Sequence, residues 1–292
     1  MAATETAAGG DIVALTPADA AALCPLSQEA GWNQVAADWR LMLELGRGFG
    51  SKAADGRWLA SALMLPLGPA LAWLSMVLVT APARGQGLGT RLLLRCLATA
   101  EASGRLAGLD ATEFGRPIYL PLGFVDQFQL ARWHWQAPSR LQVAAPAGIV
   151  VGAARAQDLA EIVAYDAQKS GYRRQPILTD LWRRSAGFAQ VARRPDGGLA
   201  GFVLGRDGRL SWHLGPIVAD NEATALALLS AAAAMLAQPL IVDVPEPHRQ
   251  LRDWLVDRGA TAPRRYTRML RAADRTSGEA QCVFALAGPE LG

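Results

Sequence analysis

The chain carries the same order of predicted elements twice. The segments "DIVALTPADAAAL" (11–23) and "GIVVGAARAQDLAEIV" (148–163) both read as a strand, a short loop and a helix. Near the end of each copy, a glycine at a predicted helix end precedes an arginine by nine residues, giving the pairs Gly123/Arg132 and Gly259/Arg268. Repetition over this length indicates one fold used twice. A chain of 292 residues is also long enough for about two domains.

Composition excludes several classes of partner. The net charge is +3, and no dense Lys/Arg run with interleaved aromatics is present, so a nucleic-acid partner is not expected. No apolar run reaches the ~18 residues that span a bilayer, so no membrane partner is expected. The first ten residues lack the basic and apolar regions of a secretion signal. Three cysteines, odd in number and far apart, indicate reduced thiols in a cytoplasmic protein without a metal site.

The stretch "RGQGLGT" (84–90) stands between a predicted buried strand, 71–80, and a predicted helix, 88–103. Backbone amides at a helix start lack intrahelical partners, and the helix dipole adds positive charge there. Glycines let such a backbone approach an anion closely. The loop therefore indicates a diphosphate cradle, and the alternative is a tight turn without a ligand. The spacing fits neither a nucleoside-triphosphate loop, which ends Gly-Lys-Ser/Thr, nor the dinucleotide pattern Gly-x-Gly-x-x-Gly.

Two motifs in the first half resemble those of one family. Arg84-x-x-Gly87-x-Gly89 is similar to the pyrophosphate loop of GNAT-superfamily acetyltransferases, and "YLPLGF" is similar to a second family motif, with Tyr119 four residues before Gly123. These segments, together with "LSQEAGWNQVAADW" and the closing "ALAGPELG", look like a tandem-GNAT subfamily whose C-terminal domain is degenerate.

The resemblance implies an α+β (mixed α/β) fold with two tandem GNAT-like domains, each a mixed, mostly antiparallel sheet flanked by helices. The expected organisation is a disordered lead (1–10), a catalytic GNAT domain (11–136), a linker (137–148), a degenerate GNAT-like domain (149–272) and a C-terminal tail with a possible edge strand (273–292).

The resemblance also implies acetyl-CoA as co-substrate and assigns roles to residues. The amides of 86–90 would hold the pyrophosphate, and the strand end would hold the pantetheine arm. The expected cofactor-binding set is Val77, Leu78, Val79, Arg84, Gly85, Gln86, Gly87, Leu88, Gly89 and Thr90. Tyr119 would protonate the departing thiolate, a role that fits a phenol with a reference pKa near ~10.

The acceptor side is less defined by the sequence. A neutral amine must attack, so a base or a water chain must take its proton. The candidate bases are Asp38, Asp110 and Glu113, each of which is also compatible with a solvated or capping role. Trp32, Asn33 and Trp39 are candidates for the acceptor pocket, and core packing is the alternative for the tryptophans.

The second half lacks both the glycine loop and the tyrosine of the first half. Its corresponding loop reads "VADNEATA", and Leu255 stands where Tyr119 stands in the first copy. His213, beside Trp212, fits a core position better than a catalytic base. The sequence therefore predicts one active site, in the first half, and a second half that supports or caps the acceptor pocket.

The leading hypothesis is an acetyl-CoA-dependent N-acetyltransferase that acts directly on a primary amine of a small molecule. The alternatives are a non-catalytic acyl-CoA-binding sensor or scaffold, and an enzyme that acetylates a protein or peptide. Whether the chain is a monomer or a homodimer stays open.

Overall fold

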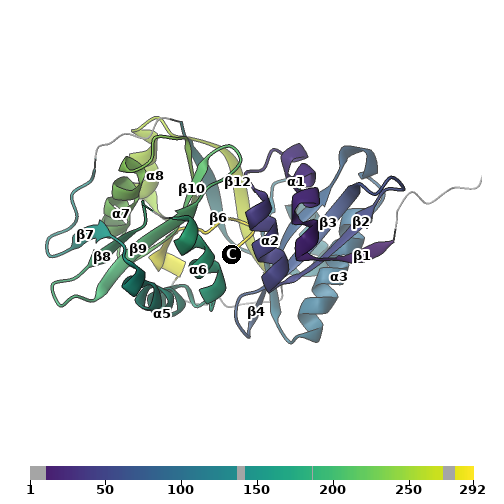
Figure 1. The fold of residues 1–292 in the computed structure, drawn as a ribbon, viewed down its shortest axis with the longest axis horizontal. Helices are drawn as coiled ribbons and strands as arrows, with labels where there is room; N and C mark the ends of the chain where they lie inside the picture. The colour runs from purple at the N-terminus through teal and green to yellow at the C-terminus, as the bar shows by residue number, and fades with distance from the viewer. Residues whose placement is uncertain (1–10, 137–141, 186, 272–279) are drawn as a thin grey trace, which may run out of the picture.

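The computed structural model describes residues 11–136, 142–185, 187–271 and 280–292. The expected disordered lead and part of the expected linker, 137–141, lie outside these ranges, and 142–148 contain no helix or strand. Strands and helices alternate in two halves that lie side by side (Figure 1). The first half contains β1 (Ile12–Leu15), α1 (Ala20–Glu29), α2 (Ala36–Leu45), β2 (Arg47–Lys52), β3 (Trp58–Pro66), β4 (Leu71–Val79), α3 (Leu88–Ala102), β5 (Leu106–Thr112), α4 (Arg116–Tyr119) and β6 (Phe124–Trp135).

The second half repeats this order. It contains β7 (Val150–Ala153), α5 (Leu159–Ser170), α6 (Gln175–Arg184), β8 (Gln190–Arg193), β9 (Leu199–Arg206), β10 (Trp212–Ala219), α7 (Glu222–Ala234), β11 (Leu240–Pro245), α8 (Arg249–Val256), β12 (Thr261–Arg271) and, after the repeat, β13 (Val283–Ala285). Both glycines of the sequence repeat adopt positive φ, +83° at Gly123 and +75° at Gly259, which favours glycine over residues that carry a Cβ.

Within the described ranges the strands form one sheet, in the order β1-β2-β3-β4-β5-β12-β6-β11-β10-β9-β8-β7. Only the β4–β5 and β10–β11 pairs are parallel, and the other pairs are antiparallel. The prediction of an α+β fold with a mixed, mostly antiparallel sheet flanked by helices is confirmed, and the structure shows that both halves share one sheet.

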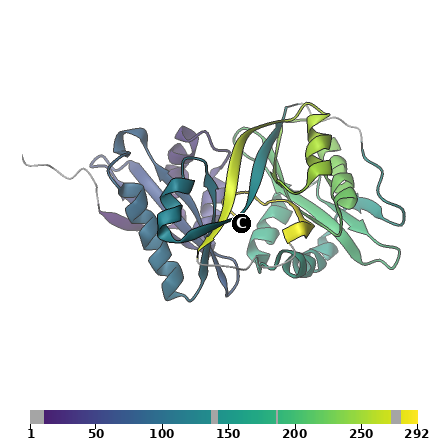
Figure 2. The same ribbon diagram turned by 180° about the vertical axis from the view of Figure 1, so that it is seen from behind.

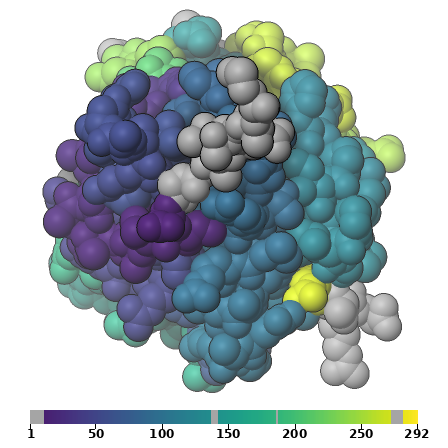
Figure 3. All heavy atoms as spheres, turned by 90° about the vertical axis from the view of Figure 1, so that its right-hand side faces the viewer, coloured from purple at the N-terminus to yellow at the C-terminus, as the bar shows by residue number. Residues whose placement is uncertain are grey.

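The last strand of each half is exchanged. β12 pairs with β5 of the first half, β6 pairs with β11 of the second half, and β6 and β12 pair with each other along the centre. In Figure 2 these two strands run together between the halves. Figure 3 shows the end of β12, in yellow, emerging between α3 and the segment from α4 to β6. There Arg271 donates to the carbonyl oxygen of Leu122 at 2.8 Å and forms an ion pair with Glu101 of α3.

The helices cover the two faces of the sheet in corresponding sets (Figures 1 and 2): α1, α2, α5 and α6 lie on one face, and α3, α7 and α8 lie on the other. The helix predicted after the glycine loop buries one apolar face, with Leu92 and Cys96 fully inaccessible against β3 and β5. On the other face, one apolar cluster runs from Trp39 and Met42 of α2 to Ile177 and Leu181 of α6. The two halves therefore share a hydrophobic core as well as a sheet.

Several elements were not predicted from the sequence. Strands β2 and β8 and helix α6 lack a clear local pattern, and β2 reads "RGFGSK". Helix α2 begins at Ala36, because the Asp38 carboxylate accepts a hydrogen bond from the Val35 backbone N–H and starts the helix there. The strand expected in the C-terminal tail is present as β13, but it pairs with β10 inside the second half instead of lying at an edge of the sheet.

Candidate active site

A gap opens between β4 and β5 in the first half. The two strands pair only from Leu71 to Trp73 opposite Leu106 to Gly108. Beyond that point β4 bulges, because Met76 has a φ of +52° and the register against β3 shifts between Ser61 and Leu63. A bulge bends a strand away from its neighbour and redirects side chains, so β4 diverges from β5 along its second half.

The glycine loop lies at the end of β4. Gly85 and Gly87 have φ values of +76° and +70°, and a Cβ on either would meet no atom within 4 Å. Gly87 is the N-cap of α3, so the free amides of the first helical turn face open space. Gly89 is different, because a Cβ there would lie 3.1 Å from the Val79 side chain. The loop therefore combines close packing on β4 with an exposed cradle of amides suited to an anion.

Arg84 connects this loop to β4 and to α1. Its Nε donates to the carbonyl oxygen of Val79 at 3.0 Å, and its guanidinium lies 3.6 Å from the Glu29 carboxylate. Glu29 also accepts a hydrogen bond from the Ala81 backbone N–H at 2.7 Å. The expected cofactor-binding residues from Val77 to Thr90 thus run from the end of β4 through the glycine loop into the first turn of α3.

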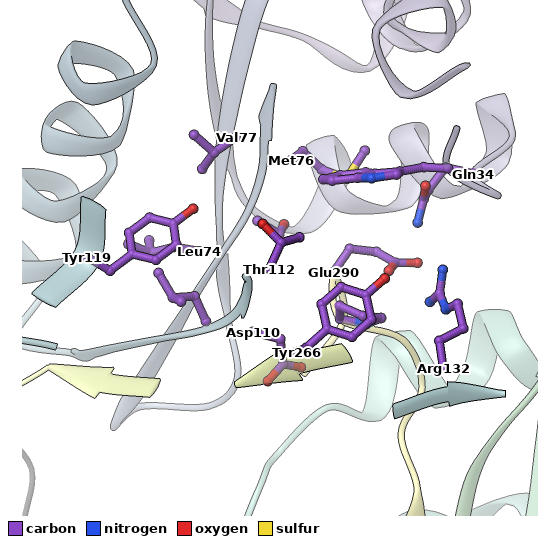
Figure 4. A pocket seen from close by; sticks show the side chains of 14 residues that line it. Gln34, Leu74, Met76, Val77, Asp110, Thr112, Tyr119, Arg132, Tyr266 and Glu290 are labelled. Carbon is purple, nitrogen blue, oxygen red and sulfur yellow. The ribbon is translucent and has the colours of Figure 1, made fainter. Parts of the chain in front are cut away.

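A cavity of about 70 Å³ lies in the gap between β4 and β5. Three parts of the chain line it: Met76, Val77 and Tyr119 from the first half, Tyr266 from the exchanged strand β12, and Glu290 from the C-terminal tail. Figure 4 shows Tyr119 at one side, with Gln34, Arg132, Tyr266 and Glu290 gathered at the other. The cavity is therefore completed by residues far apart in the sequence.

Tyr119 stands at the end of α4, a single helical turn that begins with Arg116-Pro117. Its ring packs against Phe124, with ring centroids 5.9 Å apart. Burial raises the pKa of Tyr119 to about 12. The phenol is therefore protonated at neutral pH and can donate a proton into the cavity.

The three candidate bases lie in different environments. Asp110 lines the cavity, but Arg268 holds both of its oxygens at 2.9 and 2.8 Å. Burial raises the pKa of Asp110, and Arg268 opposes that shift. Glu113 is exposed and is not among the cavity residues. Asp38 is buried, and its Oδ1 lies 2.6 Å from Arg184 and 3.0 Å from Arg206 of the second half. It joins the halves and caps α2.

Only one of the three predicted acceptor residues lines the cavity, namely Trp32. Trp39 is fully buried in the core, where its indole N–H donates to the Ser27 hydroxyl at 3.3 Å. The Asn33 side chain binds the backbone of Leu210 and Ser211 and so holds the β9–β10 loop of the second half.

The sequence did not identify Gln34, Arg132, Tyr266 or Glu290 as site residues. Arg132 appeared only as a marker of the repeat, and Glu290 lies within the closing segment "ALAGPELG". Gln34 lies within the segment "LSQEAGWNQVAADW", and Tyr266 carries no local signal. Their positions depend on the exchange of strands and on the course of the tail.

The corresponding gap in the second half is filled by the chain itself. β10 and β11 pair only at Trp212 and His213, and β10 then bulges at Gly215-Pro216, as β4 does at Met76-Val77. β13 pairs with β10 beyond this bulge, and the Leu286 backbone N–H donates to the Asp243 carbonyl oxygen at 2.9 Å. At the position of Tyr119 the second half has Leu255, which is fully buried.

No helix in the described ranges is both long and apolar enough to cross a bilayer. Nor do His, Cys, Asp and Glu side chains gather in these ranges in a group of three or more that could hold a metal ion.

Comparison with known proteins agrees with this architecture. Residues 162–285 match the family model described as "Acetyltransferase (GNAT) domain". The chain is 26% identical over 252 residues to "Uncharacterized N-acetyltransferase YitH" of Bacillus subtilis, covering 85% of this chain and 87% of that protein. It is 29% identical over 228 residues to "Holothin acyltransferase" of a Pseudoalteromonas species, covering 76% and 73%.

Solved structures show the same fold. A putative acetyltransferase from Pyrococcus horikoshii matches with a TM-score of 0.77 at 18% identity, covering 97% of this chain and 95% of that one. A tandem GNAT protein from the clavulanic acid biosynthesis pathway matches with a TM-score of 0.63 at 16% identity, covering 91% and 99%.

Proposed function

Because this chain belongs to the GNAT superfamily of N-acyltransferases, we propose that it transfers an acetyl group from acetyl-CoA directly to a primary amine of a small molecule. One observation carries the proposal. The cavity with the phenol of Tyr119 at one end lies in the β4–β5 gap, and the open glycine loop follows the end of β4.

The residues of the loop fit the diphosphate of acetyl-CoA. The amides of Gln86 to Thr90 would hold the pyrophosphate at the start of α3, where the helix dipole favours an anion. The backbone of β4 from Val77 to Val79 would hold the pantetheine arm where β4 leaves β5. The thioester would then reach the cavity beside Tyr119.

Tyr119 would act as the general acid. The amine nitrogen attacks the thioester carbonyl carbon, a C–N bond forms, and the C–S bond breaks. The phenol gives its proton to the departing sulfur. Starting from an ammonium ion, the nitrogen loses two protons and the sulfur gains one, so one proton leaves the site per turnover.

The enclosure of the cavity favours a small acceptor over a protein. Among the described residues, exchanged strand β12 and the C-terminal tail line the side opposite Tyr119, where they would obstruct a peptide backbone. The curated relative at 29% identity is an acyltransferase that is named for holothin. We therefore keep protein acetylation and acyl-CoA sensing as alternatives of lower rank.

An amine-library screen tests this function. Purified protein is incubated with acetyl-CoA and single amines, and released CoA thiol is followed together with the mass of the product. We expect acetylated small amines and no acetylated peptide. Tight acetyl-CoA binding without turnover of any amine or peptide would instead support a sensor, and acetylated lysate proteins would support the protein acetyltransferase.

A further inference from the structure

Two hydrogen-bond acceptors converge at the end of the cavity opposite Tyr119. Glu290 and Gln34 both line the cavity, with exposed fractions of 3% and 4%. Gln34 lies close enough to Glu290 for its side-chain amide to help lower the pKa of the Glu290 carboxyl. Within the described part of the chain, the Oε1 atom of Gln34 has no hydrogen-bond partner. A buried acceptor without a donor is rare in folded proteins, so this atom points to a ligand that brings an N–H or O–H group.

The charges around Glu290 favour a cation. Arg206 is ion-paired with both Glu290 and Asp38, and Arg184 is ion-paired with Asp38 and with two further carboxylates, those of Asp180 and Asp207. Four carboxylates thus share two guanidinium groups in this network. A positively charged ligand group beside Glu290 would supply part of the missing positive charge.

The other charged groups that face this end of the cavity are already paired. Arg132 lines the cavity, but Asp243 holds its guanidinium through two contacts of 2.7 Å. Asp110 is held in the same way by Arg268. His213 lies 3.2 Å from Asp243, and burial and Arg206 lower its pKa, so it is neutral. Glu290 differs from these groups because its ion-pair partner, Arg206, is shared with Asp38, so the Glu290 carboxylate is the charge that a ligand cation can pair with. Burial raises its pKa, but Arg206 and Arg132 outweigh burial and keep it ionised at neutral pH.

The tail holds Glu290 firmly in place. β13 is fastened in the β10–β11 gap, and the Trp73 indole N–H donates to the Pro289 carbonyl oxygen at 2.7 Å. Arg174 donates to the Gly292 carbonyl oxygen at 2.6 Å. At Gly288 the φ is +130°, and a Cβ would lie 2.9 Å from both Glu290 carboxylate oxygens, so the backbone packs directly on this side chain.

We propose that Glu290 and Gln34 form the subsite that binds the acceptor amine, and that Glu290 selects acceptors that arrive as ammonium ions. The inference rests on the proposed function and adds which class of amine the enzyme selects. Gln34 Oε1 accepts one N–H of the acceptor, and the Glu290 carboxylate pairs with its charge. The amine nitrogen is then held on the side of the thioester opposite Tyr119. Figure 4 shows Tyr119 at one end of the cavity and Gln34 and Glu290 at the other.

The test compares two acceptors of equal length, butylamine and O-propylhydroxylamine. Near neutral pH the first is an ammonium ion and the second is neutral, and both carry a primary NH₂ or NH₃⁺ group. In Glu290→Gln we expect kcat/KM for butylamine to fall about 100-fold, mostly through KM, because a buried charge-assisted contact is lost. The value for O-propylhydroxylamine should stay within about threefold. A general structural defect would lower both values equally, which would overturn the proposal.

Three further variants complete the design. Glu246→Gln is the matched control, because Glu246 is ion-paired with arginines, Arg252 and Arg265, as Glu290 is with Arg206, but does not line the cavity. This variant should leave kcat/KM unchanged for both acceptors. Gln34→Leu should lower kcat/KM for both amines, because it removes the neutral amide oxygen that accepts an N–H from either of them. Glu290→Asp keeps the charge and should retain the preference for butylamine, even if Glu290→Gln folds poorly.

Saturation-transfer NMR separates this proposal from the proposed function. In the presence of CoA, butylamine should give a signal with the wild type and lose it with Glu290→Gln, whereas O-propylhydroxylamine should keep its signal. Binding with this pattern but without acetylation would refute the acetyltransferase and leave the subsite intact. Acetylation with no difference between the two acceptors would refute the subsite alone.

Discussion

Arg268 of β12 lies directly opposite Asp110 of β5, and its guanidinium holds both carboxylate oxygens at 2.9 and 2.8 Å. The same pair occurs a second time, between Arg132 of β6 and Asp243 of β11. In each case the arginine comes from one half of the chain and the aspartate from the other. The nine-residue interval between glycine and arginine in the sequence thus marks a reciprocal contact that joins the halves.

Removing one partner of this contact should destabilise the protein. Arg268→Met leaves the Asp110 carboxylate buried without its cation, so we expect the free energy of unfolding to fall by about 3–5 kcal/mol. Urea denaturation measures the change. Arg116→Met is the control, because its pair with Asp126 is about 40% exposed on both sides, and should cost less than about 1 kcal/mol. Equal losses in the two variants would contradict a structural role for the buried pair.

The glycine loop should decide acetyl-CoA binding. Acetyl-CoA should raise the Tm of the wild type, because a ligand that binds only the folded state stabilises it. Gly87→Val places a side chain at φ +70° in the path of the pyrophosphate and should abolish the shift. Gly56→Val tests backbone strain alone, since Gly56 has a φ of +84° and open space in the β2–β3 turn. It should lower the Tm but keep the acetyl-CoA shift.

Tyr119→Phe should lower kcat by roughly 10²–10⁴-fold, the usual contribution of a general acid, with little change in acetyl-CoA affinity. Stopped-flow turnover and calorimetry measure the two quantities. Tyr165→Phe is the control, because this hydroxyl bonds to Ala200 and Asp220 in the second half. Near-normal turnover in Tyr119→Phe would mean that another group protonates the thiolate, whereas loss of acetyl-CoA binding would give Tyr119 a structural role.

The pH dependence of kcat gives a separate check on Tyr119. A phenol is the useful acid only while protonated, and burial raises the pKa of this one to about 12. We therefore expect no loss of kcat from tyrosine ionisation up to about pH 10, where an ordinary tyrosine would be half ionised. An alkaline decline near pH 10 that disappears in Tyr119→Phe would show that the phenol is not shielded.

Calorimetry should give one acetyl-CoA site per chain. The second half has no glycine cradle, and β13 pairs with β10 where the gap would admit a pantetheine arm. The Gly87→Val variant should therefore lose all binding. Residual binding at half the original stoichiometry would reveal a second site between β10 and β11.

The local features of the fold were predictable from the sequence, whereas the long-range ones were not. The strand before the glycine loop, the loop and helix α3 follow from hydrophobic runs and glycine spacing, and the structure gives the helix as Leu88–Ala102. The exchange of β6 and β12 has no local signature, because either strand could pair within its own half by the same alternation of residues. Glu290 could not be assigned for the same reason. It reaches the cavity only because β13 directs the tail through the second half.

The candidate carboxylates illustrate this limit. The sequence offers Asp38, Asp110 and Glu113 as candidate bases, because a carboxylate could take the proton of the attacking amine. The structure pairs Asp38 with arginines of the second half and Asp110 with Arg268, and it leaves Glu113 exposed. Their environments depend on partners more than 100 positions away, which spacing within a motif does not report.

The exchange of strands also bears on the order of synthesis. The first half leaves the ribosome first, but the edge of β5 has no partner until β12, residues 261–271, has been made. An unpaired edge strand invites association with other chains. During this interval β6 lacks both β11 and β12, so both edges of β6 are exposed in addition to the edge of β5. The sheet of the first half therefore stays incomplete until the second half has been synthesised. If translation stopped between β6 and β11, the unpaired edges could pair with another chain.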